Sequence, residues 1–164
     1  MAILPILRFP DPGLRTACRP VTVFDSRLAT LASDLADTMR AAPGIGITAP
    51  HVGIYERLTV IELDGSASQR VYVNPQVTWS SPDMQRHTEG SVSMPGVTDE
   101  VERPARIRVS WQDLQGQSHE EEADGLLAVC LQHEIDQLDG IFWIDRLSRL
   151  KRERIVRKFR KTGA

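Results

Sequence analysis

The sequence predicts an α+β protein, because segments with helical periodicity are interleaved with runs of short strands. Apolar residues recur at helical spacing in three places, and β-branched runs bounded by turn residues occupy much of the chain between them. A length of 164 residues indicates one domain spanning residues 1–164. A chain of this size can bury a substantial core without disulfides or a structural metal.

The first helix is expected after a proline-rich segment that runs to Pro20 and should be extended. Asp25 is a typical N-cap residue. Apolar side chains then follow at helical spacing, namely Leu28, Leu31, Leu35 and Met39, with Ala32 and Ala36 on the same side. Pro43 and Gly44 end the helix, because proline cannot continue it and glycine favours other backbone conformations.

A glycine-punctuated loop is expected at residues 44–51, which read Gly-Ile-Gly-Ile-Thr-Ala-Pro-His. Glycines permit backbone shapes, or a close approach of a ligand, that other residues resist. The segment is not a dinucleotide-binding fingerprint, because no strand is expected before it and no third glycine follows at the required spacing.

Short strands are predicted after this loop, at residues 58–63, 71–73, 77–79, 107–111 and 118–123. A turn at Asp64–Gly65 separates the first two, and a turn at Gln115–Gly116 joins the last two. The last strand is mostly polar, so we expect it to be a partly solvated partner of the strand before it.

Two further helices are expected near the end of the chain. The first runs from Asp124, a plausible N-cap, to Asp139–Gly140, where glycine favours a helix end. The second covers about residues 148–161. Its docking stripe is predicted to consist of Leu147, Leu150, Ile155, Val156 and Phe159.

The charge of the chain is distributed unevenly. Residues 145–164 carry nine Lys or Arg and two acids, a net charge of +7, whereas the rest of the chain is at −9. A basic helix on an acidic body is typical of proteins with a polyanionic partner such as RNA. The alternative is a solvated helical face that pairs with the acids of the body, and both interpretations stay open.

The remaining composition favours a cytoplasmic protein. Cys18 and Cys130 are too few for a disulfide framework, so reduced thiols are expected. The N-terminus lacks a basic leader and Pro5 interrupts its apolar run, so we expect no signal peptide. No apolar run approaches membrane-spanning length. We expect no membrane partner and no DNA partner.

The segment at residues 132–137, Gln-His-Glu-Ile-Asp-Gln, is related to the His-Glu-x-x-His motif of metallohydrolases. On a helix, positions i and i+4 lie on one face, so two imidazoles can hold one metal while the glutamate acts on its bound water. Here His133 and Glu134 are present, but the i+4 position holds Gln137, and a neutral amide is a poor ligand for zinc or iron.

Three segments in order make the chain resemble the peptide deformylase family, whose patterns are GxGxAAPQ, EGCLS and QHExDHLxG. The corresponding segments here begin at Gly44, at Glu89 (Glu-Gly-Ser-Val-Ser) and at Gln132. The resemblance implies antiparallel sheets around a central motif helix, with further N-terminal and C-terminal helices. It also implies a reaction, the hydrolytic removal of the formyl group from the N-terminal formylmethionine of nascent peptides.

In that family iron or zinc is held by the cysteine of the second motif and both histidines of the third. The motif glutamate shuttles the proton, and the glutamine of the first motif steadies the oxyanion. This chain carries Ser91, Gln137 and His51 at the cysteine, second-histidine and glutamine positions. His133 is thus the sole retained metal ligand, and we expect metal binding to be weak or absent. Thr98 stands where many members have a substrate-binding arginine.

The resemblance assigns the remaining positions by correspondence. Glu134 is the candidate catalytic residue, and Ile45, Gly46, His51 and Val92 are the candidate substrate-binding residues. We expect a deformylase-like protein with weak or no activity. The alternative is a non-catalytic module that binds formylated peptide N-termini or associates with the ribosome and its RNA through the basic C-terminal helix.

Two other uses of these residues stay open. A relocated metal site could be formed by His51 and His133, and a metal-free site could use His51, Ser91 and Glu134 as a nucleophilic triad. The other residues of this kind have simpler interpretations: packing for Cys130, surface positions for His87 and His119, and core or rim positions for Trp79, Trp111 and Trp143.

Overall fold

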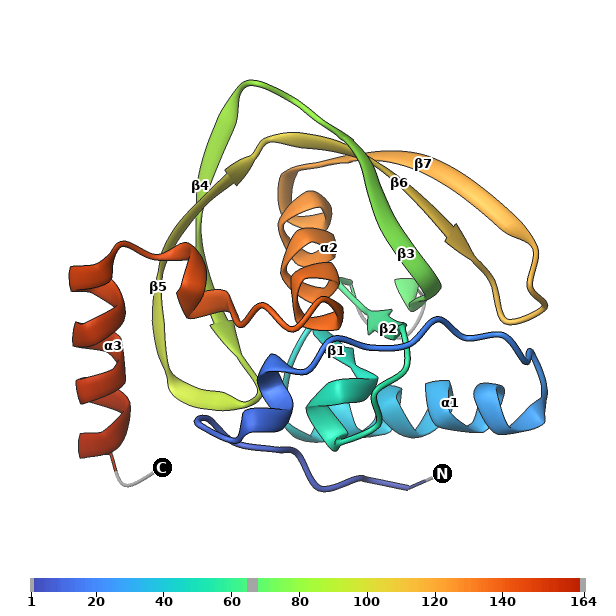
Figure 1. Cartoon of the computed structure of the whole chain (residues 1–164), viewed down its shortest axis with the longest axis horizontal. Helices are drawn as coiled ribbons and strands as arrows, with labels where there is room; N and C mark the ends of the chain where they lie inside the picture. The colour runs from blue at the N-terminus through green and yellow to red at the C-terminus, as the bar shows by residue number, and fades with distance from the viewer. Residues whose placement is uncertain (1, 65–67, 163–164) are drawn as a thin grey trace.

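The computed structural model describes residues 2–64 and 68–162. Figure 1 shows one helix at the centre, with strands arching over it, a second helix beneath and a third at the far edge. The elements of the described part, in chain order, are α1 (Ser26–Ala41), β1 (Gly46–Thr48), β2 (Leu58–Ile61), β3 (Arg70–Ser80), β4 (Met84–Ser91), β5 (Met94–Pro104), β6 (Arg106–Gln112), β7 (Ser118–Asp124), α2 (Gly125–Leu138) and α3 (Arg149–Lys161).

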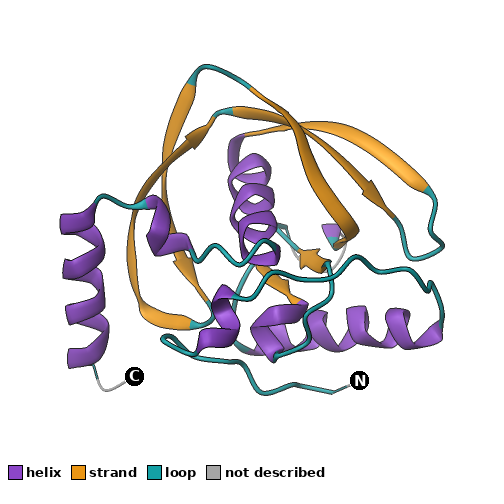
Figure 2. Ribbon diagram, in the orientation of Figure 1, coloured by secondary structure: helices purple, strands orange, loops and turns teal. Residues whose placement is uncertain are grey.

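The strands form two sheets. One has the order β1-β2-β3-β6-β7 and the other is the hairpin β4-β5, and all the pairings are antiparallel. Outside these elements, loops and short 3-10 helices connect the layers, and the segment before α1 is loop apart from one such helix at Pro12–Arg15 (Figure 2). The α+β class and the antiparallel sheets around a central helix, both predicted from sequence, are confirmed.

The central helix α2 is buried along nearly its whole length, from Ala128 to Leu138. One side packs on the five-stranded sheet through Leu131 and Ile135, which join Ile61 and Val109 in one apolar cluster. Because both the sheet and the hairpin surround this helix, even its polar residues are withdrawn from water.

Two other apolar clusters hold the outer helices. Helix α1 packs its leucines against β1 and β2. Its N-cap is Asp25, whose side chain accepts a hydrogen bond from the Leu28 amide, as predicted. Helix α3 packs against β5, with Ile155 and Phe159 buried on Val101 and its neighbours. No helix in the described ranges is long and apolar enough to cross a membrane.

The structure corrects several predicted element boundaries. β3 is one strand of 11 residues, where the sequence predicted two short ones. The predicted loop at 44–51 contains strand β1 and part of a 3-10 helix at Ala49–Val52. Gly65 of the predicted turn lies outside the described residues.

The hairpin β4–β5 was not predicted at all. Its two strands carry mostly polar, partly exposed residues, so the apolar alternation that indicates a strand is weak there. The predicted docking stripe of the last helix is wrong at Leu150, which is 77% exposed, while Leu147, Ile155 and Phe159 are buried. Leu147 lies before α3, which begins at Arg149, so Leu147 and Leu150 do not belong to one helical stripe, and Leu150 falls on an exposed side of the first turn.

Candidate functional site

A cavity of about 450 Å³ lies between the central helix and two loops. Its lining comes from residues 42–46 with His51, from residues 89–92 and 94–98 of the β4–β5 hairpin, and from one side of α2. The predicted site residues that line it are Ile45, Gly46, His51, Ser91, Val92, His133 and Glu134. Tertiary structure therefore brings the three sequence motifs to one place.

Gly46 fixes the distance between the first motif and the helix. It begins strand β1, which pairs with β2 in the sheet that packs on α2. A Cβ atom at this position would collide with the Glu134 carboxyl group. The glycine is thus required by a close approach of two chain segments, whereas the sequence suggested an unusual backbone shape or the close approach of a ligand.

His133 is held by a buried ionic network. Its Nδ1 lies 2.8 Å from Oε1 of Glu89. Arg103 donates to both oxygens of Glu89, at 2.6 and 2.9 Å, and to Asp136 at 2.9 Å. Asp136 also accepts two hydrogen bonds from Arg146, at 2.8 and 2.9 Å. The network orients the imidazole so that Nε2 is the nitrogen left for the cavity.

The sequence reasoning gave Glu89 no separate role and missed Arg103 and Asp136. Asp136 lies three residues after His133, so helical spacing could have indicated that the two are neighbours. For Arg103 the sequence offers no comparable signal, because its place depends on the unpredicted hairpin.

The network sets the charges around His133. Burial by itself would raise the pKa of Glu89, but the hydrogen bonds from His133 and Arg103 outweigh it and lower the pKa to about 2. Burial would lower the pKa of His133, but the Glu134 charge and the hydrogen bond with Glu89 outweigh it and raise the pKa. Glu89 is therefore an anion that stabilises a proton on the Nδ1 atom of His133.

His51 is fully buried, with 1% of its surface exposed. Its Nδ1 accepts a hydrogen bond of 3.0 Å from the backbone amide of Thr48. Its Nε2 is buried without a hydrogen-bond partner among the described residues. Burial, reinforced by the nearby His133, lowers the pKa of His51 to about 3, so the ring is neutral near pH 7.

Glu134, like His51, lines the cavity with a buried polar atom that has no partner among the described residues. Its side chain is packed against Gly46, and its Oε1 has no hydrogen-bond partner in the part of the chain that the structure describes. Burial raises its pKa to about 7, and the Glu89 charge adds to this while His133 opposes it. The group therefore can hold or release a proton near neutral pH, as a general acid or base must.

The other two predicted positions make different contacts. The Oγ of Ser91 accepts a hydrogen bond of 3.1 Å from the backbone amide of Ser93. Gln137 is buried and does not line the cavity, and its amide nitrogen donates to the Leu14 carbonyl at 2.6 Å. Within residues 2–64 and 68–162, no three His, Cys, Asp or Glu side chains form a group that could hold a metal ion.

Comparison with known proteins identifies the family to which this chain belongs. A sequence model of the polypeptide deformylase family matches residues 3–153. The chain belongs to the peptide deformylase family. A peptide deformylase-like protein of Brucella melitensis is 62% identical over 98% of both chains. A peptide deformylase of Phenylobacterium zucineum is 46% identical, over 98% of this chain and 97% of that one.

A solved structure supports the same family assignment. A peptide deformylase from Legionella pneumophila is 42% identical and superposes with a TM-score of 0.92, over 99% of this chain and 96% of that one. At this similarity the chain has the deformylase fold. Ser91, His133 and Gln137 can therefore be compared with the motif positions of the family on the same backbone.

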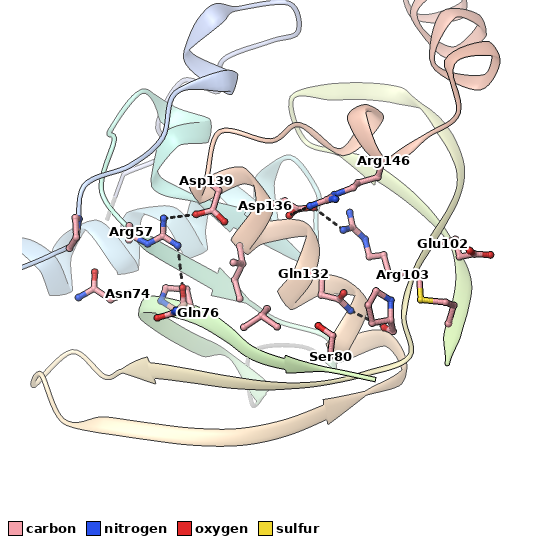
Figure 3. Close-up of a pocket in the computed structure, with 16 residues that line it drawn as sticks. Arg57, Asn74, Gln76, Ser80, Glu102, Arg103, Gln132, Asp136, Asp139 and Arg146 are labelled. Carbon is pink, nitrogen blue, oxygen red and sulfur yellow. Dashed lines mark hydrogen bonds and ion pairs between the residues drawn. The ribbon is translucent and has the colours of Figure 1, made fainter. Parts of the chain in front are cut away.

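A larger cavity, of about 800 Å³, lies against a different side of α2 (Figure 3). Arg57, Arg103 and Arg146 line it, and each is paired with Asp136 or Asp139. The dashed contacts in Figure 3 show that these charges already satisfy one another. In this deformylase-family chain the smaller cavity is the candidate functional site, because residues of all three motifs line it and because His51 and Glu134 each bring to it a buried polar atom without a partner among the described residues.

Proposed function

We propose that this chain is a peptide deformylase-like protein with weak or no metal-dependent deformylase activity. Membership of the family supports the reaction class, hydrolytic removal of a formyl group from peptide N-termini. One observation carries the proposal of weak activity: Gln137, at the position of the second histidine ligand, is turned to a backbone carbonyl and does not line the cavity.

The donor set does not fit a catalytic zinc or iron ion. Such a site needs three protein ligands, usually imidazole, thiolate or carboxylate. His133 can supply one imidazole nitrogen. The hydroxyl of Ser91 is neutral near pH 7 and already accepts a hydrogen bond, which makes it a weak metal ligand.

The relocated metal site is disfavoured by the hydrogen bond of His51. Because a backbone amide donates to Nδ1, the proton of the neutral ring is on Nε2, and that nitrogen has no lone pair for a metal. A hydrogen on Nε2 also disfavours a triad with His51 as the base, since a base for Ser91 would have to accept a proton at Nε2.

A deformylation assay tests the proposal. N-formylmethionyl peptides are incubated with the purified chain, with and without added Fe²⁺, Co²⁺ or Zn²⁺, beside the Glu134→Gln variant. We expect at most a slow rate that does not rise with metal. A fast, metal-dependent rate that is lost in Glu134→Gln would refute the proposal, because it would require an intact centre.

A gain-of-function variant separates the ligand argument from other causes. Ser91→Cys combined with Gln137→His supplies the two missing ligand types. We expect the double variant to bind zinc near one equivalent by elemental analysis, while the parent chain binds little. A folded double variant with no more zinc than the parent would show that these two positions do not explain the difference.

A non-catalytic binding role is the second candidate, and the basic helix α3 favours it. Helix α3 lies at the edge of the molecule (Figure 1). Only its Ile155 and Phe159 are buried, and its basic residues are partly or fully exposed. Such a surface suits ribosomal RNA, with binding that weakens steeply as salt rises. Equal ribosome association after exchange of Arg152, Arg157 and Arg160 for glutamine would argue against this role.

A further inference from the structure

The N-terminal segment binds the first two motif segments through its backbone. The amide of Leu7 donates a hydrogen bond of 2.8 Å to the carbonyl of His51, at the end of the first motif. Two residues later, the amide of Phe9 donates a bond of 2.9 Å to the carbonyl of Ser93, at the end of the second motif. We call residues 7–18 the N-terminal strap. Because one short stretch of its backbone donates to both motifs, the strap limits how far they can separate.

The strap is also bound to α2, which carries the third motif. The side-chain amide of Gln137 donates to the carbonyl of Leu14 at 2.6 Å. The amide of Cys18 donates to the carbonyl of Leu138 at 2.9 Å, and a Cβ atom on Gly140 would collide with the strap backbone. Figure 1 shows the N-terminal chain passing the end of α2 on its way to α1. The strap therefore lies directly on the C-terminal end of the motif helix.

Both replaced ligand positions take part in this arrangement. Gln137 is 1% exposed, and its side chain binds the strap. The hydroxyl oxygen of Ser91 accepts the amide N–H of Ser93, whose carbonyl accepts from Phe9. A metal ion bound at these two positions would cross-link the hairpin to α2, but their donors do not fit zinc or iron. The same two segments are instead joined through the strap.

We propose that the N-terminal strap replaces the cross-link that a metal ion would provide between the hairpin and α2, and that Gln137 is the positioning residue that fastens it. The connection runs from the hairpin into the Phe9 amide, along the strap, and from the Leu14 carbonyl into α2. This goes beyond the proposed function, because it concerns how the motif segments are held together and not what the cavity binds.

Apolar packing shields the strap from water near its hydrogen bonds. The Phe9 ring stacks on Phe142 with centroids 5.7 Å apart, and it meets the ring of Phe159 in α3 edge-on at 6.1 Å. Leu14 is 1% exposed and belongs to the same apolar cluster. A hydrogen bond in such surroundings is electrostatically stronger than in water, and a buried carbonyl left without its donor is costly. Loss of the Gln137 donor should therefore release the strap locally.

Amide hydrogen exchange followed by NMR tests the strap in the parent chain first. Residues that open as one cooperative unit exchange with a common dependence on denaturant. We expect the amides of Leu7, Phe9 and Cys18 to share one dependence on urea, at concentrations below the unfolding transition. Three unrelated dependences would overturn the proposal, and this measurement needs no variant.

Gln137→Met removes the donor and keeps the length of the side chain. We expect the three strap amides to exchange at least about tenfold faster, because the Leu14 carbonyl loses its donor. Amides of the central strands, such as those of Val60 and Val109, should change less than about twofold, because the opening is local. Gln76→Met makes the same change at an exposed glutamine and is the matched control, with no effect on the strap.

Two results with a folded Gln137→Met variant would contradict the fastening role. Unchanged exchange at the three strap amides would show that Gln137 does not hold the strap. Equal acceleration at all amides, those of the central strands included, would show that Gln137 stabilises the whole fold and does not position one segment.

Treatment of the parent chain with EDTA tests whether the cross-link is independent of metal. We expect the chelator to leave the exchange of the three strap amides unchanged. Faster exchange at Phe9 and Cys18 after chelation would overturn the proposal, because it would show that a bound ion holds the segments together. The readout is independent of deformylation, so a failure here is distinguishable from a failure of the proposed function.

Discussion

Replacing Arg103 by methionine should be among the most destabilising single changes in the described part of the chain. Methionine keeps the apolar stem but removes the guanidinium, which makes three hydrogen bonds to Glu89 and Asp136. After the change Asp136 keeps Arg146, but Glu89 keeps His133 alone. Arg103 and Glu89 side chains are each only 4% exposed, so water cannot replace the lost contacts.

Two physical considerations bear on the loss of unfolding free energy in Arg103→Met. Removing one partner of a buried ion pair typically costs about 3–5 kcal/mol, because a charge is left buried. Independently, the pKa of Glu89 falls from 4.5 to about 2 in the folded protein, which corresponds to about 3 kcal/mol of stability above pH 5. His133 is the larger cause of the lowered pKa, so Arg103 accounts for only part of that value, and the expected cost of about 3 kcal/mol rests on the buried ion pair.

The assay is urea unfolding followed by circular dichroism, from pH 7 down to pH 2. Because the folded pKa of Glu89 is lowered, its contribution is present above pH 4.5 and is lost as pH falls toward 2. The difference between parent and Arg103→Met should therefore be largest at pH 5–7 and shrink on acidification. Arg146→Met, whose side chain is 46% exposed, is the control and should cost about 1 kcal/mol or less.

Equal destabilisation by Arg103→Met and Arg146→Met, or a difference that does not depend on pH between 5 and 2, would refute this reasoning. The first result would mean that burial does not set the strength of the pair. The second would mean that Glu89 is not the group whose ionisation the arginine supports.

Three further predictions concern packing and hydrogen bonding. Gly46→Ala should lower the unfolding free energy by about 1–3 kcal/mol and displace Glu134. Thermal melts would show the first effect and weaker formyl-peptide binding the second, and an unchanged melting temperature would contradict the close approach. Phe159→Ala should cost about 3–5 kcal/mol and Leu150→Ala less than about 0.5, and similar costs in urea unfolding would mean that α3 docks by another face. Asn74→Asp should cost about 1–3 kcal/mol, because the amide donates to two oxygens that a carboxylate cannot serve; a neutral effect on the urea midpoint would count against it.

The helices were predictable because their signals are local. Asp25 caps its own helix, and the apolar residues of α1 repeat at the helical period within a few turns. The hairpin β4–β5 lacked such a signal, since most of its residues are polar and its buried apolar residues Met94, Val97 and Val101 do not follow a regular spacing of two. Leu150 was wrongly predicted to pack in the docking stripe, because apolar periodicity near a helix start does not say which turn reaches the interface.

In the candidate site, too, some features followed from local sequence patterns and others depended on distant residues. The three motifs and their order indicated which segments meet, and the cavity contains most of the residues predicted from them. Nothing local indicated that Arg103 would reach Glu89, or that Gln137 would turn to Leu14, 123 residues earlier in the chain. Those contacts exist only once the hairpin and the N-terminal segment are packed on α2.

The sequence by itself determined the family, the α+β class, the helices and the residue types at the ligand positions, because these follow from short patterns in which neighbours along the chain are neighbours in space. Tertiary structure decided the roles of those residues. Burial gave Glu134 a pKa near 7, and the backbone amide of Thr48 donates a hydrogen bond to the Nδ1 atom of His51. A side chain's protonation and hydrogen bonds depend on the groups that folding brings to it, and residues distant in sequence supply most of them.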